Sequence, residues 1–211
     1  VDVTAPHRHR HVIGHLHQLD AAGVGRAIDA AVAAQPEWAA WSLQERAAVF
    51  LKAADLIAGP WRERLNAATM VGQSKTIVQA EIDAACELAD FLRFNVHFAE
   101  RLCTEQPDSG PGLWNRVDYR PLEGFVYAIS PFNFTAIGGN LATAPALLGN
   151  TVVWKPATAA GLAAWHIMQI LQQAGLHPGI AVQDEDGKAT GQRWPDADRA
   201  STPHLSVLVP G

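Results

Sequence analysis

Two short runs of apolar residues, 125–130 (FVYAIS) and 151–155 (TVVWK), constrain the fold more than any other feature of the sequence. Both are rich in β-branched and aromatic residues, which is typical of strands covered on both faces. One segment of helical composition, 135–150, joins them, and a second, 158–175, follows. The order strand, helix, strand, helix predicts a right-handed crossover and a parallel sheet. The fold class that follows is α/β.

The preceding segment, residues 21–106, predicts a helical region. Apolar residues between Val24 and Val32 recur at the spacing of one helix face. Pro36 is expected to end this first helix, because proline removes a backbone donor and crowds the preceding turn. The helix over 158–175 is expected to end at Gly175, since glycine readily takes the left-handed conformation found there.

Further helix signals follow along the same region. Ser42 and Glu45 form a capping box that opens a second helix, and Gly59 ends it. A short helix is expected over 61–71, and Ser74 is expected to open a long one. The candidate core positions of that long helix are Ile77, Ile82, Ala85, Leu88, Ala89, Leu92, Val96 and Ala99.

Three other segments lack helical periodicity. Residues 1–20 are polar and His-rich and predict a solvated N-terminal arm. Residues 113–122 alternate well enough to be a strand. Residues 180–211 are polar and rich in Pro and Gly up to about position 204, which predicts a disordered tail. The last residues, 205–211, are a candidate short strand.

Composition and charge limit the kinds of partner that are expected for this chain. The net charge of −5 argues against a nucleic-acid partner, which needs clustered Lys and Arg. No apolar run reaches roughly 18 residues, so no membrane span is expected. Residues 1–12 lack the pattern of a secretory signal peptide.

Cys86 and Cys103 form no CxxC pair, which favours a reducing compartment, either the cytoplasm or, in a eukaryote, the mitochondrial matrix. Cys86 is expected to be a small packing residue.

The His-rich start leaves one alternative open. Four histidines lie at spacings of two and four residues, which metal ligands also use, but no cysteine accompanies them. A solvated arm without metal is the preferred interpretation. The histidines concerned are His7, His9, His11 and His15.

Polar side chains follow both predicted strands where each ends. Ser130 and Asn133 come after the first strand and Lys155 ends the second. Ligands of open α/β sheets collect at this edge. A neutral amide suits an oxygen that gains negative charge, a lysine suits ribose hydroxyls, and the flanking Phe132 and Phe134 are expected to exclude water. The alternative is that Asn133 caps the helix that begins two residues later.

These motifs resemble a known family. SPFNFTA (130–136) followed by GNTVVWKPA (149–157) is similar to the aldehyde dehydrogenase superfamily. Two longer strings, 65–102 and 114–150, are similar to the delta-1-pyrroline-5-carboxylate dehydrogenases within it. The resemblance covers residues 1–179.

The resemblance implies roles for individual residues. Asn133 becomes an oxyanion donor, Phe134 lines the aldehyde tunnel, and Glu81 is an acidic group near the substrate. The alternative for Glu81 is a solvated helix charge. No metal is implied. The cofactor is NAD, and the residues implied to contact it are Ser130, Pro131, Phe132, Lys155 and Thr158.

The resemblance also implies an architecture, an incomplete aldehyde dehydrogenase fold with a partial Rossmann-like parallel sheet. Residues 21–106 are then the helical part of the cofactor-binding domain, 113–122 a strand of an oligomerisation hairpin, and 123–179 a partial NAD-binding βαβα unit. The implied reaction is NAD-dependent oxidation of L-glutamate gamma-semialdehyde, a small-molecule aldehyde, to L-glutamate in proline catabolism. The implied assembly is a homo-oligomer.

Some positions depart from the family pattern. Thr158 stands where many members carry a ribose-binding acid, which leaves the choice between NAD and NADP open. Family members are longer, and neither Cys86 nor Cys103 matches their nucleophile. The chain is therefore expected to be an N-terminal portion that is inactive and does not assemble by itself. Two alternatives are a non-catalytic NAD-binding fragment and an aldehyde dehydrogenase with another substrate.

Overall fold

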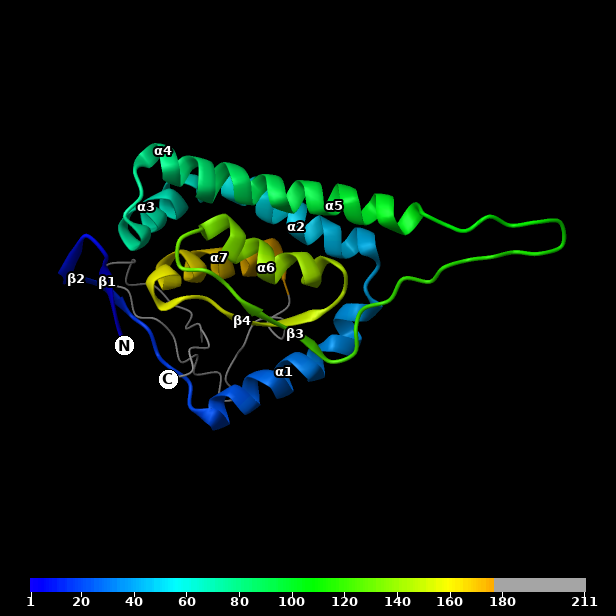
Figure 1. Cartoon of the computed structure of the whole chain (residues 1–211), viewed down its shortest axis with the longest axis horizontal. Coiled ribbons are helices and arrows are strands. Elements are labelled where there is room, and N and C mark those ends of the chain that lie inside the picture. Colours follow the sequence, from blue (N-terminus) through cyan, green and yellow to red (C-terminus); the bar gives the residue numbers. More distant parts are fainter. Residues whose placement is uncertain (177–211) are drawn as a thin grey trace.

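The computed structural model describes residues 1–176. Two strands, β3 (Phe125–Ile129) and β4 (Thr151–Lys155), lie in the middle of this part (Figure 1). They pair in parallel, from Phe125 opposite Thr151 to Ile129 opposite Lys155. The strand–helix–strand–helix prediction is thereby confirmed.

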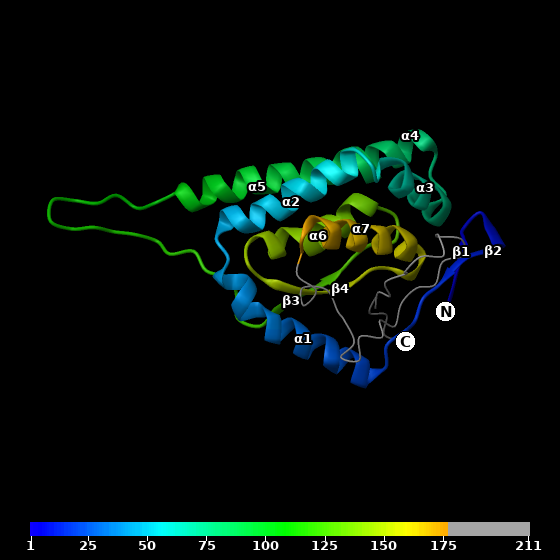
Figure 2. The same ribbon diagram turned by 180° about the vertical axis from the view of Figure 1, so that it is seen from behind.

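Helices cover the strand pair in layers. One face lies against α1 (Ala21–Ala40) and the other against α6 (Thr135–Leu147), with α7 (Gly161–Ala174) beside α6. Beyond these lie α2 (Leu43–Ala58) and α5 (Leu88–Thr104), as both views show (Figures 1 and 2). The main core fills the space between the outer and inner helices.

The two strands differ in burial. β4 is buried along its length except at Lys155, as predicted. In β3, Tyr127 and Ile129 are 47% and 59% exposed, so the prediction that this strand is covered on both faces is wrong. The physical reason is that α1 packs against Val153 of β4 on this face, whereas in β3 it contacts only Phe125.

The first helix continues through Pro36, so the predicted end there is wrong. Trp38 explains the difference: it is 2% exposed, and its indole Nε1 donates to the carbonyl of Ala146 at 2.8 Å. Anchoring this large side chain offsets the cost of a proline inside a helix. The capping box of Ser42 and Glu45 and the left-handed Gly175 are confirmed.

The long helix begins later than predicted. After α3 (Arg62–Gln73), Ser74 has a positive φ of 53°, and Thr76 forms the cap in a capping box with Gln79. A short α4 (Ile77–Ala80) then runs through a π-helical turn, η1 (Glu81–Glu87), into α5.

The π-helical turn also explains which positions are buried. The predicted core positions from Ala85 to Ala99 are buried, but Ile77 and Ile82 are 57% and 60% exposed. A π-helical turn carries an extra residue and rotates the face that precedes it, so a pattern of 3.6 residues per turn misplaces those two. Cys86, which lies within this turn, is exposed, so its predicted packing role is wrong.

Residues 1–20 form more than a solvated arm. The strands β1 (Asp2–Ala5) and β2 (Arg8–His15) pair antiparallel. Val3 and Leu16 are 1% and 2% exposed and join the main core, which explains why this polar segment is ordered. Within residues 1–176, no three His, Cys, Asp or Glu side chains are grouped closely enough to hold a metal ion.

The strand predicted over 113–122 is absent. Instead, a long loop between α5 and β3 extends away from the helices and strands (Figure 1). Its pairing is limited to a single bridge between Gly110 and Leu113, because within residues 1–176 no strand lies beside it.

A short 3-10 turn, η2 (Thr158–Ala160), precedes α7. No helix of residues 1–176 is long and apolar enough to cross a membrane. The predicted tail and last strand lie outside the described residues.

Candidate active site

The loop between β3 and α6, residues 130–134, holds most of the predicted site residues. Its first residue is fixed to β4: the backbone N–H of Ser130 donates to the carbonyl of Lys155 at 3.1 Å. The Ser130 hydroxyl accepts a hydrogen bond from Trp154 Nε1 at 3.0 Å and is buried. Ser130 therefore extends the strand pairing by one residue and positions the loop on the carboxyl edge of the sheet.

A narrow apolar pocket lies under this loop. Its lining includes Ser130, Pro131 and Phe134 of the loop, Trp154 and Pro156 around the end of β4, and residues of α6 and α7. The pocket thus joins three of the predicted site residues with the end of β4. Phe132 does not line it and is 65% exposed.

Asn133 does not cap α6, so the capping alternative is wrong. The residue at the cap position is Phe134, which makes no side-chain cap bond. Within residues 1–176, the exposed Asn133 side chain makes no hydrogen bond. Its amide is consequently free to donate to a ligand at the strand edge.

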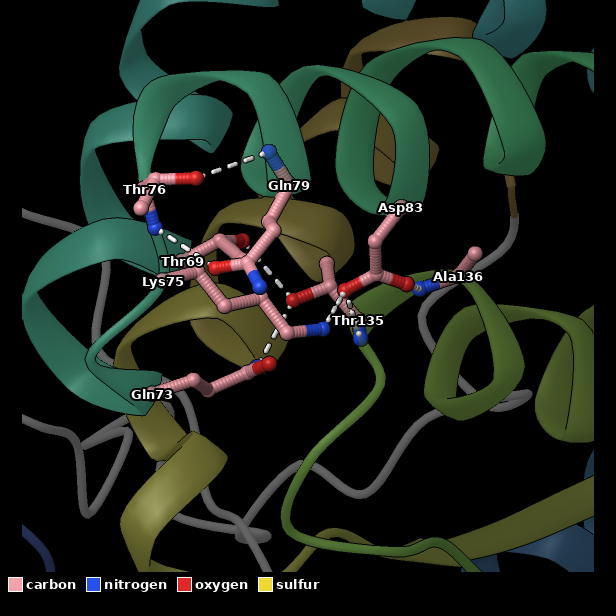
Figure 3. A network of polar contacts seen from close by, with 8 residues as sticks. All are labelled: Thr69, Gln73, Lys75, Thr76, Gln79, Asp83, Thr135 and Ala136. Atoms are coloured by element: carbon pink, nitrogen blue, oxygen red, sulfur yellow. Dashed lines mark hydrogen bonds and ion pairs between the residues drawn. The ribbon is translucent and has the colours of Figure 1, made fainter.

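The cap of α6 comes from Asp83, 50 positions before Asn133 in the sequence, on η1 (Figure 3). Its carboxylate accepts from the backbone N–H of Thr135 at 2.9 Å and from that of Ala136 at 3.1 Å. Lys75 Nζ donates to the same carboxylate at 2.6 Å. A negative charge is stabilised at a helix N-terminus by the free N–H groups and the helix dipole.

The side chain of Thr135 is held from α3. Its hydroxyl contacts Thr69 Oγ1 at 2.8 Å and accepts from Gln73 Nε2 at 2.7 Å (Figure 3). Sequence reasoning missed all of these groups. A signal was present for Asp83, which falls on the apolar face beside Ala80 and Ala84, where a charge needs a partner.

The network decides which donors the loop can offer. The N–H groups of Thr135 and Ala136 already bond Asp83, so they are not available to an aldehyde oxygen. The amide of Asn133 is a donor that the loop exposes. The predicted aromatic shield is missing from residues 1–176, where Phe132 and Phe134 are 65% and 40% exposed. Lys75 Nζ lies 4.5 Å from the centroid of the Phe134 ring.

Lys155 and Thr158 lie at the end of β4, on the same edge as Ser130. Lys155 is the last residue of the strand and Thr158 is the first of η2. Both side chains are half-buried and make no hydrogen bond within the described part of the chain. Their polar groups are therefore available to ribose hydroxyls.

Glu81 is separate from this edge. Its carboxylate bonds Arg62, accepts from Asn66 Nδ2 at 2.5 Å, and lies 3.6 Å from the thiol of Cys86. The hydrogen bonds from Arg62 and Asn66 lower the pKa of Glu81 below its ordinary value. Glu81 is thus ionised and paired with α3 rather than merely solvated, and within residues 1–176 it makes no hydrogen bond to the loop 130–134.

Several known proteins are similar to this chain in sequence. A model of the family described as "Aldehyde dehydrogenase family" matches residues 1–199. The mitochondrial delta-1-pyrroline-5-carboxylate dehydrogenase of Mus musculus is 57% identical over 176 residues, 83% of this chain and 31% of the mouse protein. The enzyme of that name from Agaricus bisporus is 53% identical and is covered over 32% of its length.

Solved structures give the same result. The crystal structure of the Delta-pyrroline-5-carboxylate dehydrogenase from Mycobacterium tuberculosis superposes with a TM-score of 0.84 at 61% identity. The match covers 85% of this chain and 33% of that one. A second structure of that enzyme is bound with NAD and matches equally well. The chain spans about a third of the length of the relatives it matches.

Proposed function

The chain belongs to the aldehyde dehydrogenase family. We propose that it supplies part of the site in which L-glutamate gamma-semialdehyde is oxidised to L-glutamate with NAD. The substrate is inferred from the relatives, which are named delta-1-pyrroline-5-carboxylate dehydrogenases. The observation that carries the proposal is the exposed, unbonded Asn133 on the same sheet edge as Ser130 and Lys155.

The role of Asn133 follows from its chemistry. When a nucleophile adds to an aldehyde, the carbonyl oxygen gains negative charge. An amide N–H aimed at that oxygen stabilises the charge without itself titrating. The Asn133 amide fits this role because it has no other partner within residues 1–176.

The carboxyl edge of the sheet fits a dinucleotide. Lys155 Nζ and the Thr158 hydroxyl, both without partners within residues 1–176, would hold ribose hydroxyls. Ser130, Pro131 and Phe132 would lie along the cofactor where the chain crosses from β3 to α6. Bound NAD supplies the acceptor for the hydride.

Two further roles rest on the family. Phe134 would form a wall of the aldehyde tunnel, and Glu81 would place a negative charge near the charged groups of the substrate. We assign the covalent step to neither cysteine, because Cys86 lies against Arg62 and Glu81 and Cys103 lies in the last turn of α5. Residues 113–122 are proposed as the segment of this chain through which copies of the complete enzyme associate.

The experiment that tests the proposal is a chimera. Residues 1–176 replace the matching segment of the Mycobacterium tuberculosis enzyme, and NADH formation is followed with the semialdehyde and with simple aliphatic aldehydes. Turnover of the semialdehyde supports the proposal. Turnover of aliphatic aldehydes without turnover of the semialdehyde refutes the substrate assignment and favours an aldehyde dehydrogenase of other specificity.

A substitution then tests the oxyanion role. Asn133→Ala is expected to lower kcat by about 10²–10³-fold, the effect of losing one oxyanion donor, and to leave the KM for NAD unchanged. Asn140→Ala is the matched control, because Asn140 accepts from Asn95 at 2.7 Å and has no place in the site. Normal kcat with a large rise in the KM for NAD would show that Asn133 is a cofactor contact instead.

A further inference from the structure

We propose that Asp83, together with Lys75, is a positioning pair that holds the loop 130–134 in the geometry needed for oxyanion stabilisation. The proposal rests on the proposed function of Asn133. Neither residue would touch the aldehyde, and both would act through Asn133 and Phe134.

The loop 130–134 is anchored at both ends. At its start, Ser130 is bonded to β4 through both its backbone N–H and its hydroxyl. Immediately after its end, Thr135 is bonded to Asp83 through its backbone N–H. Only four residues separate the two anchors, and the first of them is Pro131, whose ring fixes φ. Asn133 therefore has little freedom while both anchors hold.

The two anchors differ in how they are built. The bond of Ser130 to Lys155 continues the strand pairing, so the sheet itself maintains it. The backbone anchor at Thr135 depends on the carboxylate of the buried Asp83, which bonds two N–H groups and an ammonium at once. Thr69 and Gln73 hold only the Thr135 hydroxyl, so it is the backbone part of this anchor that the Asp83 side chain controls.

Lys75 links that anchor to the wall of the tunnel. The side chains of Lys75 and Asp83 are 15% and 5% exposed, so each charge depends on the other. From this position Lys75 Nζ also lies over the ring of Phe134 at 4.5 Å. Without Asp83 the ammonium would lose its ion-pair partner and would turn toward water. The contact with Phe134 would then be lost together with the anchor of Asn133.

The first arm of the test uses the full 211-residue chain and measures backbone amide exchange by NMR. Asp83→Asn preserves volume but removes the charge. At least one of the amides of Thr135 and Ala136 is expected to exchange at least about tenfold faster in this variant, because asparagine keeps only one of the two oxygens that accept from them, and a helix-terminal N–H without its acceptor opens to solvent. Asp90→Asn is the control, since Asp90 is exposed on α5 and makes no ion pair within residues 1–176. Unchanged exchange in Asp83→Asn overturns the proposal.

The second arm uses the chimera and separates positioning from general stability. Asp83→Asn is expected to lower kcat by up to about 10²-fold, the scale of a misplaced catalytic group, with the KM for NAD unchanged. In the Asn133→Ala background the same substitution should change kcat by less than about twofold, because the effect of Asp83 on kcat acts through the Asn133 side chain, which is gone, whereas its effect through Phe134 falls mainly on the KM for the aldehyde. Fully additive losses in this double-mutant cycle would overturn the positioning role.

A second, less disruptive substitution tests the proposal if Asp83→Asn does not fold. Lys75→Met keeps the bonds from Asp83 to α6 but removes the cation beside Phe134. It is expected to raise the KM for the aldehyde several-fold with a smaller effect on kcat, and an unchanged KM overturns the role of Lys75. Should the unsubstituted chimera oxidise no aldehyde, the proposed function fails, while the exchange measurements still decide whether Asp83 anchors the loop.

Discussion

Lowering the pH from about 7 to about 5 is expected to destabilise the chain through His166. This residue lies on α7 with its ring between those of Trp165 and Trp61, at centroid distances of 4.8 and 5.8 Å. Its Nδ1 is buried and makes no hydrogen bond in the described part of the chain. Burial, and secondarily the charge of Arg64, lowers the pKa of His166 from 6.5 to about 4.

The sign of the effect follows from these values. In the unfolded chain His166 gains its proton near pH 6.5, whereas in the folded chain it stays neutral down to about pH 4. The unfolded state therefore binds more protons within this window, and stability falls as the pH falls. Linkage gives a loss of about 2 kcal/mol in the free energy of unfolding between about pH 7 and about pH 5.

The assay is urea unfolding followed by tryptophan fluorescence at both pH values. His166→Phe retains an aromatic ring but cannot titrate, and it removes a buried nitrogen that has no partner. This variant is expected to lack about 2 kcal/mol of the pH-dependent loss. His17→Phe is the control, because His17 is exposed and makes no hydrogen bond within residues 1–176.

Other titrating groups do not obscure the comparison. Burial and the charge of Asp83 raise the pKa of Glu87, so protonation of Glu87 favours the folded state as the pH falls, which is opposite to the effect of His166. That contribution is the same in the parent and in His166→Phe, so it cancels in the difference. An equal pH-dependent loss in the two proteins would refute the reasoning about His166.

Three further outcomes are expected. In Gly139→Ala the new Cβ would lie 2.8 Å from a methyl group of the buried Leu88, so the free energy of unfolding in urea should fall by about 1–3 kcal/mol. In the control Gly138→Ala the nearest atoms lie at 3.6 Å, and the free energy of unfolding should not fall. Ser42→Ala removes a helix cap and should cost about 1 kcal/mol in the same assay; an unchanged midpoint would contradict the capping box. In the chimera, Lys155→Met should raise the KM for NAD about tenfold with little effect on kcat, since it removes a charged hydrogen bond; an unchanged KM would remove Lys155 from the cofactor site.

Local sequence determined those features whose interactions lie within a few residues. The capping box of Ser42 joins residues three apart, and Gly175 ends its helix through its own backbone conformation. The two strands and their crossover could also be predicted, because a continuous apolar run has few alternatives to a buried strand. Long specific strings around Asn133 and Lys155 identified the family by resemblance.

Contacts between distant parts of the chain determined the rest. Trp38 carries α1 through Pro36 by bonding Ala146, which lies 108 positions away. The polar start of the chain is ordered because Val3 and Leu16 find places in a core made by later helices. The segment 113–122 has a strand-like pattern but no neighbouring strand within residues 1–176, and a strand exists only through its pairing.

The candidate site also depends partly on local sequence and partly on contacts between distant parts of the chain. The sequence indicated that Asn133, Ser130 and Lys155 would share one edge, because parallel strands place their carboxyl ends together. It could not show that Asn133 is free, since the first residue of the helix is not fixed by the sequence and Asn is a preferred cap. The tertiary structure decided this point by bringing Asp83, from 52 positions before Thr135, to the start of α6. A carboxylate bonds helix N–H groups more strongly than a neutral amide does, so Asp83 takes the cap and Asn133 stays available for chemistry.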